Sequence, residues 1–172
     1  ALESDSIKLG NLFSGIDMSF VVTCLGGGTG TGGLPALLDS ARTEGSLTIC
    51  LVTLPFSFEG ERKRELAAES VREIHDLCDA LIVIPNNRLA EFGDKEGAAE
   101  TFADVNKVLS KGVSSVVGLL KRPGFINIGF SDLKRVMEGS DSPCTFGFGE
   151  GKGDNKARQA VAGLVEGPLL GR

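Results

Sequence analysis

The 172-residue sequence contains no tryptophan, no tyrosine and only one histidine. Aromatic stacking therefore depends on its ten phenylalanines. The single histidine, His75, has no second histidine or cysteine at ligand spacing, so we expect no metal site. The four cysteines form no CxxC pair, and a reducing, cytoplasmic compartment explains such widely spaced thiols most simply.

Long apolar runs are also missing, since none reaches the roughly 18 residues that a membrane-spanning helix requires. Residues 1–5 lack the basic-then-apolar order of a signal peptide. The net charge is −5, from 18 Lys and Arg against 23 Asp and Glu. Binding along a nucleic acid needs clustered cations, so we expect no nucleic-acid binding. Because no apolar run is long enough, we also expect no direct membrane insertion.

Three short apolar segments, residues 18–24, 47–53 and 80–84, have the length and β-branched composition of buried strands. Helical patterns at residues 33–43 and 61–77 separate them. Such alternation predicts an α/β fold, a Rossmann-like parallel sheet with helices on both faces. Cys24 and Cys50 fall within predicted buried strands, where a reduced cysteine behaves as a small apolar residue.

A longer helix is predicted at residues 98–121, where apolar residues recur at steps of three and four. Pro123 ends it, and shorter elements follow: a helix at 131–137, a strand-like segment at 144–148 and a helix at 156–164. We therefore divide the chain into residues 1–97, a connecting helix at 98–123, and the beginning of a second α+β domain at 124–172.

The stretch from Gly26 to Gly33 has six glycines in eight positions, between a predicted strand and a predicted helix. Glycines let backbone N–H groups approach an anion closely, and a helix N-terminus adds unpaired N–H groups and a positive dipole. This arrangement favours a phosphate-binding loop, although a purely structural glycine turn stays open. The candidate phosphate-binding residues are Gly27, Gly28, Thr29, Gly30 and Thr31.

A dinucleotide-binding dehydrogenase is the rival interpretation, because Gly28, Gly30 and Gly33 satisfy the GxGxxG pattern. That fold places an acidic residue at the end of the next strand, where it binds the ribose hydroxyls. Here the next strand ends Val52-Thr53-Leu54-Pro55, without an acid. The dehydrogenase interpretation fails at this point.

Four features of the sequence are short motifs: residues 26–32 read GGGTGTG, residues 55–60 PFSFEG, residues 84–89 IPNNRL, and residues 122–127 and 130–134 RPGFIN and FSDLK. Together these segments resemble the tubulin/FtsZ family of GTP-dependent filament proteins. They match its GGGTGTG signature, its PF-x-FEG loop and its IPN-x-RL segment, and they are similar to its RPGLIN-x-DFADVK loop, called the synergy loop. The segments occur in the family's order and spacing through nearly the whole chain.

The resemblance implies a GTP/GDP site in residues 1–97, with Mg²⁺ accompanying GTP. Gly28, Thr29 and Gly30 would hold the phosphates, and Glu59 would contact the sugar side of the nucleotide. A helix-start acid is the alternative interpretation of Glu59. Lys63 stands where the family usually has an arginine, which either weakens the phosphate contact or brings in a neighbouring arginine; a solvated charge run is equally compatible.

Phe102 and Asn106 lie one helical turn apart, where the family places an aromatic residue and an Asn or Asp against guanine. Core packing is the alternative for Phe102. In the family, the synergy loop of one subunit reaches the nucleotide of the next. The resemblance therefore assigns catalytic roles to Asn127 and Asp132, although Gly129 replaces the first acid of the loop and Asp132 also suits a helix cap.

Family members begin with a further strand, glycine loop and helix, so the resemblance implies that this chain is part of a longer protein. That protein would be a GTPase that polymerises head-to-tail into the cell-division filament at a cytoplasmic division site, with other division proteins as partners. The chain alone is expected to bind nucleotide weakly and to have little activity. The alternative is a degenerate, non-catalytic relative that acts as an assembly or regulatory module.

Overall fold

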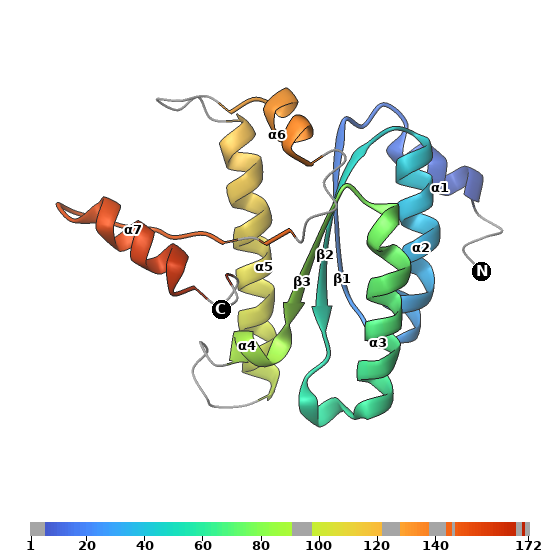
Figure 1. Ribbon diagram of the computed structural model, residues 1–172, viewed down its shortest axis with the longest axis horizontal. Coiled ribbons are helices and arrows are strands. Elements are labelled where there is room, and N and C mark those ends of the chain that lie inside the picture. Colours follow the sequence, from blue (N-terminus) through green and yellow to red (C-terminus); the bar gives the residue numbers. More distant parts are fainter. Residues whose placement is uncertain are drawn as a thin grey trace. The chain divides into compact units, whose positions relative to one another are not determined.

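The computed structural model describes residues 6–90, 98–121, 128–137, 144–145, 147–167 and 170. Figure 1 shows the elements in chain order: α1 (Ser6–Phe13), β1 (Met18–Cys24), α2 (Gly28–Thr43), β2 (Leu47–Leu54), the 3₁₀ turn η2 (Ser57–Glu59), α3 (Glu61–Ile74), the 3₁₀ turn η3 (His75–Leu77), β3 (Ala80–Pro85), α4 (Asn86–Ala90), α5 (Ala98–Lys121), α6 (Phe130–Met137) and α7 (Lys156–Val165).

The three strands form one parallel sheet in the order β1-β2-β3. Phe20 lies opposite Ile49, and Ile49 lies opposite Ala80. Because the strands are parallel, their carboxyl ends meet at a single edge of the sheet. The loops that leave β1 and β2 begin at this edge, where open α/β sheets bind their ligands.

β2 is buried continuously from Leu47 to Thr53. A strand whose successive side chains point to opposite faces is buried throughout only where both faces of the sheet are covered. On one face, α2 packs against β1, β2 and α3, and Figure 1 shows α2 and α3 side by side along the strands. The buried core residues here are Val21, Leu25, Leu34, Leu38, Cys50, Val52, Ala67 and Ile74. The predicted α/β class with a parallel sheet is confirmed.

The chain divides into two compact units. The first comprises Ala1–Pro85 and Lys134–Cys144, and the second comprises Asn86–Leu133 and Thr145–Arg172. Within the second unit, the Lys111 ammonium on α5 donates to Glu150 Oε2 at 2.9 Å and lies 5.1 Å from the centroid of the Phe148 ring. These contacts attach the segment before α7 to α5. The division at residues 97 and 123 stays a prediction.

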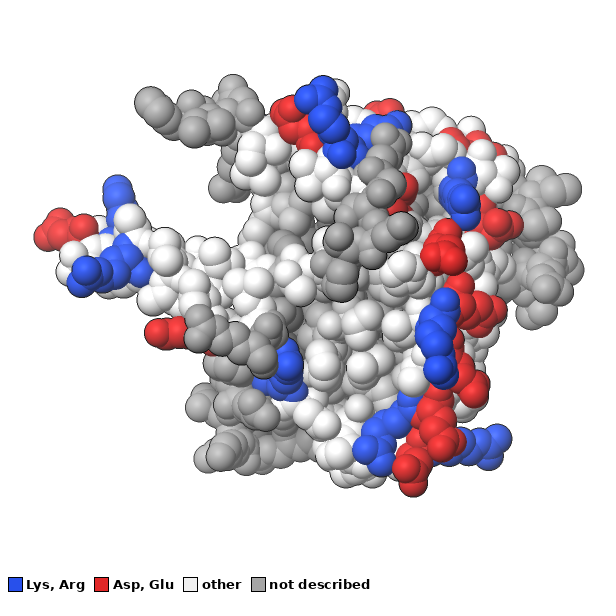
Figure 2. All heavy atoms as spheres, in the orientation of Figure 1, with Lys and Arg blue, Asp and Glu red and all other residues white. Residues whose placement is uncertain are grey.

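Several elements occur where the sequence predicts them. β1 and α5 have the predicted bounds, and β2 and β3 each extend one residue further than expected. None of the helices in the described part of the chain combines the length and apolar composition needed to cross a bilayer. Figure 2 shows acidic and basic side chains interspersed over α3, whose residues 61–66 are all exposed.

Other expectations are wrong, and packing explains why. The segment at 144–148 is not a strand at its described residues, because Gly149 and Gly151 pack against the backbone of α7 at Ala160 and Lys156 instead of pairing in a sheet. Cys24 is exposed because it is the last residue of β1, one of the two outer strands of the three described; Cys50, on the central strand β2, is buried as predicted.

Two helices also differ from the expectation. α2 begins at Gly28 instead of residue 33, so most of the glycine stretch is helical. A short helix that the sequence pattern does not predict, α4, follows β3 directly. Glycine is unfavourable within helices, so composition alone places this helix start too late.

Candidate functional site

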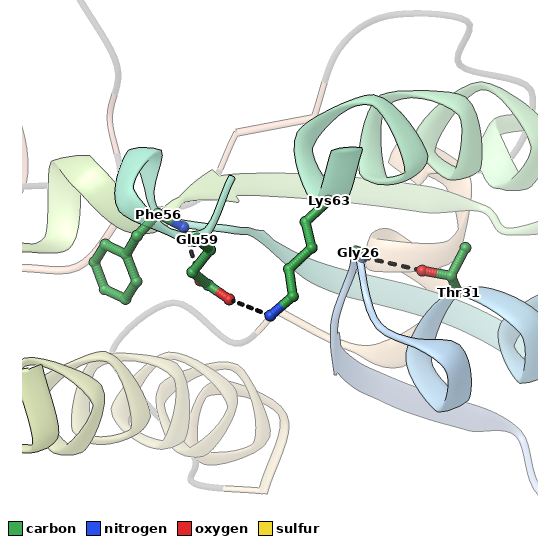
Figure 3. Close-up of polar contacts among 5 residues, drawn as sticks. All are labelled: Gly26, Thr31, Phe56, Glu59 and Lys63. Carbon is green, nitrogen blue, oxygen red and sulfur yellow. Dashed lines mark hydrogen bonds and ion pairs between the residues drawn. The ribbon is translucent and has the colours of Figure 1, made fainter. Parts of the chain in front are cut away.

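The glycine stretch connects the end of β1 directly to the start of α2. The N–H of Leu25 donates to the Thr53 carbonyl of β2 at 2.9 Å, which continues the sheet by one residue. Gly26 then turns the chain with a φ of 91°, a value that side chains other than hydrogen rarely allow. Its N–H donates to Thr31 Oγ1 at 3.0 Å, so a side chain of the helix holds the turn (Figure 3).

Two glycines in this stretch are required by packing. A Cβ on Gly26 would lie 2.8 Å from the backbone oxygen of Lys63, and a Cβ on Gly30 would collide with the carbonyl oxygen of Cys24. Gly30 therefore allows α2 to approach the end of β1, and Gly26 allows the turn to approach α3. Both glycines set the position of the helix start.

The remaining glycines at the helix start face open space. A Cβ on Gly27 or Gly28 would meet nothing within 4 Å, and these two residues and Thr29 are exposed. The N-cap, Gly27, has no side chain that could accept a hydrogen bond. The first N–H groups of a helix have no intrahelical partner, and here no capping side chain competes for them. The result is an exposed, positively polarised helix N-terminus that suits an anion.

A second loop, residues 55–60, follows β2 at the same edge of the sheet. Glu59 closes this loop, since its Oε1 accepts the Phe56 N–H at 2.9 Å and its own N–H donates to the Phe56 carbonyl at 3.1 Å. The ring of Phe56 is buried, whereas that of Phe58 is 67% exposed. The two rings stack with centroids 4.9 Å apart, so Phe58 is held in an ordered position at the surface.

The carboxylate of Glu59 has a second bond, to the ammonium of Lys63. Their atoms Oε2 and Nζ are 3.0 Å apart, and Figure 3 shows both partners of the carboxylate. Burial alone would raise the pKa of the Glu59 carboxyl, but the bonds from the Phe56 N–H and from Lys63 outweigh it and lower this pKa below its usual value. Glu59 is therefore ionised at neutral pH. Because Lys63 is paired with Glu59, the interpretation of residues 62–64 as only a solvated charge run is incomplete.

The structure thus brings part of the predicted site together. The contact between Gly26 and Lys63 joins the glycine stretch to the start of α3, and Glu59 is bonded to Lys63. Asn106 is exposed on α5 in the other unit, and Phe102 lies on the same helix, with its side chain outside the described part. Asn127 lies outside the described residues.

Asp132 occupies the first turn of α6, and its Oδ2 accepts the N–H of Gly129 at 3.0 Å. This is the helix-cap bond that the sequence also suggested. The residue is exposed, and its other carboxylate oxygen accepts no hydrogen bond from the described residues. Capping therefore uses one of the roughly four acceptor sites of the Asp132 carboxylate.

Sequence reasoning missed the separate roles of the glycines. Gly26 was not among the candidate site residues, although its backbone conformation orients the whole stretch. Six glycines in eight positions give no signal that distinguishes a packing glycine from one beside open space. Within the described residues, no group of three or more His, Cys, Asp and Glu side chains is placed to hold a metal ion.

Comparisons with a family model and with a curated relative indicate the same family. The family model described as Tubulin/FtsZ family, GTPase domain, matches residues 1–94. The cell division protein FtsZ of Haloferax mediterranei is 38% identical over 170 residues, which cover 99% of this chain and 45% of that protein. The chain therefore spans about half the length of this relative.

Solved structures agree. An empty FtsZ dimer from M. jannaschii superposes with a TM-score of 0.90 at 33% identity, covering 99% of this chain and 49% of that one. CetZ from Methanosaeta thermophila superposes with a TM-score of 0.79 at 22% identity, covering 95% of this chain and 46% of that one. The second match supports the fold alone.

From the packing of Gly30 we predict how a substitution there changes the free energy of unfolding. Gly30→Ala should lower the free energy of unfolding by about 3 kcal/mol, because the new methyl group meets the Cys24 carbonyl. Gly28→Ala is the matched control and should leave stability unchanged or raise it by up to about 1 kcal/mol. Urea unfolding of both variants tests this, and equal stabilities would contradict the assigned packing role.

Proposed function

Because the chain belongs to the Tubulin/FtsZ family of GTPase domains, we propose that it forms the nucleotide-binding part of a filament-forming GTPase of cell division. The observation that carries this proposal is the open helix start at Gly27 and Gly28, where an added Cβ would meet no other atom within 4 Å. A phosphate group fits there because glycine leaves the N–H groups accessible. GTP or GDP is the ligand, and Mg²⁺ accompanies GTP through phosphate oxygens.

In this proposal, different residues at this edge of the sheet bind different parts of the nucleotide. The N–H groups of Gly27, Gly28, Thr29 and Gly30 face the phosphates, and the hydroxyl of Thr29 supplies a further donor. Thr31 supports them, since its oxygen accepts the Gly26 N–H and its proton stays available for donation. Glu59 accepts from the sugar hydroxyls, because an ionised carboxylate is purely an acceptor.

Phe102 and Asn106 of α5 contact the guanine base in this proposal. An amide both donates and accepts, so Asn106 suits the edge of a base, and its exposed position on the helix is compatible with that role. Phe102 provides an aromatic face. Both assignments follow from the family's use of these two positions.

Hydrolysis in this proposal takes place between copies of the protein. The segment around Asn127 and Asp132 of one copy reaches the nucleotide of the next and orients the attacking water. Phosphoryl transfer depends chiefly on positioning and electrostatics, so the second carboxylate oxygen of Asp132 is the group that carries this step. Such a head-to-tail contact is heterologous and propagates into a filament instead of closing. The proposed location is the cytoplasmic division site, with other division proteins as partners.

One observation favours a second candidate function. Gly129 provides no carboxylate at a position where the family has an acid, and its N–H is used to cap α6 through Asp132. A non-catalytic relative that serves as an assembly or regulatory module would have such a loop. Phosphate release by the whole protein separates the two functions, since robust turnover excludes the non-catalytic one.

The first prediction concerns nucleotide affinity. Gly28→Ala should weaken GTP binding by the whole protein about tenfold or more, because its methyl group occupies the space in front of the helix N-terminus. Titration of a fluorescent GTP analogue measures the affinity. Gly32→Ala is the control, since it adds a methyl group in open space one turn further along α2 and should bind normally. Equal affinities of the two variants would contradict the phosphate role.

The second prediction concerns assembly. Adding GTP to the whole protein should increase light scattering, and adding GDP should produce a much smaller increase, because the nucleotide lies at the contact between copies. Scattering that does not respond to GTP would reject the filament proposal. It would leave the nucleotide-binding proposal standing if the fluorescent analogue still binds.

The third prediction concerns turnover. Asp132→Asn should lower the rate of phosphate release about a hundredfold, since it removes a charge that acts on the attacking water. An asparagine oxygen can still accept the Gly129 N–H, so the start of α6 should be preserved. Circular dichroism checks the fold of the variant. Unchanged turnover in a folded Asp132→Asn variant would show that this carboxylate is not catalytic.

A further inference from the structure

Lys63 connects the two loops of the candidate site through two different parts of the residue. Its backbone oxygen packs against Gly26, where a Cβ would lie only 2.8 Å away. Its ammonium reaches in the other direction and donates to Glu59 Oε2 at 3.0 Å. Figure 3 shows the side chain of Lys63 extending from α3 toward Glu59, with Gly26 and Thr31 on the opposite side of Lys63. A single residue thus contacts both the glycine stretch and the loop at 55–60.

The carboxylate of Glu59 is oriented by two bonds, one on each oxygen. Oε1 accepts the Phe56 N–H at 2.9 Å, and Oε2 accepts from Lys63. The Glu59 side chain is 20% exposed, compared with 50% for Lys63. Each carboxylate oxygen has a second acceptor site, so Glu59 can still bind a ligand hydroxyl while both bonds persist.

The same geometry argues against Lys63 as the main phosphate ligand. An ammonium at 3.0 Å from a carboxylate has much of its charge neutralised by that partner. Lysine also lacks the planar fork with which arginine binds phosphate through two parallel bonds. To bind a phosphate fully, Lys63 would have to release Glu59.

We infer that Lys63 is a positioning residue, which holds the Glu59 carboxylate as the acceptor for the hydroxyls of the nucleotide sugar and does not itself bind the phosphates. This inference rests on the proposed nucleotide-binding function. It assigns to the Glu59–Lys63 pair the selection of nucleotides that carry free 2′ and 3′ hydroxyls.

Comparing two ligands tests the inference. The affinities of GTP and 2′,3′-dideoxy-GTP are measured for the whole protein and for its Lys63→Met, Glu59→Gln and doubly substituted variants. Lys63→Met should weaken GTP binding about fivefold, as expected for a partly exposed ion pair, and dideoxy-GTP binding less than about twofold. The double variant should bind GTP no more weakly than Glu59→Gln alone, because Lys63 acts through Glu59.

The pH dependence provides a second readout that a purely structural role would not change. Lys63 lowers the pKa of the Glu59 carboxyl, so its removal should raise that pKa. As the pH falls, Lys63→Met should therefore lose GTP affinity at a higher pH than the wild type. Lys63→Arg keeps the positive charge within reach of Glu59 and should restore both the affinity and the wild-type pH profile.

Arg64→Met is the matched control, because it removes a neighbouring exposed cation and should change neither affinity. Equal losses for GTP and dideoxy-GTP in Lys63→Met would overturn the inference and indicate a phosphate contact. Additive losses in the double variant, or a loss in Arg64→Met with none in Lys63→Met, would overturn it as well. If the wild type binds neither ligand, the proposed function itself fails, a result distinct from all of these.

Discussion

The close approach of α2 to the end of β1 is the contact on which the rest of the site depends. It requires Gly30, because a side chain there would collide with the Cys24 carbonyl. The parallel pairing of β1 and β2 then places the loop at 55–60 at the same edge of the sheet as the start of α2. Shifting the helix by the width of a methyl group would move its N-terminal N–H groups away from this edge. The geometry of the site is therefore fixed by backbone packing before any charged side chain contributes.

The sequence predicted the strands and the long helix α5 well, because their apolar periodicity reflects burial directly. β2 is the clearest case, since residues 47–53 form a short, β-branched apolar segment in the sequence and all seven are buried in the structure. The start of α2 was predicted five residues too late, because glycine is intrinsically unfavourable in a helix. The close approach of α2 to β1, which requires Gly30, does not depend on helix propensity. The segment at 144–148 has strand-like composition, but Gly149 fits against α7, and this preference depends on a neighbour that composition cannot identify.

The candidate site was predictable to a similar extent. The position of the phosphate-binding loop followed from the order strand, glycines, helix. The separate roles of its glycines could not be predicted from the sequence, because Gly26, Gly28 and Gly30 are the same residue type in different surroundings. The Glu59–Lys63 pair has the four-residue spacing of a helical ion pair, yet Arg62 and Arg64 made the lysine look like one member of a solvated cluster. The structure shows that bonds from the Phe56 N–H and the Lys63 ammonium hold the Glu59 carboxylate in place.

The bond between the Gly26 N–H and the Thr31 hydroxyl oxygen has a consequence for the energetics of ligand binding. Glycine-rich segments lose more conformational entropy on ordering than other sequences do. Here that loss occurs when the protein folds, because Thr31 already holds the turn in its final form. An arriving anion then meets N–H groups that are fixed in place, and little of its binding free energy is consumed in ordering the chain.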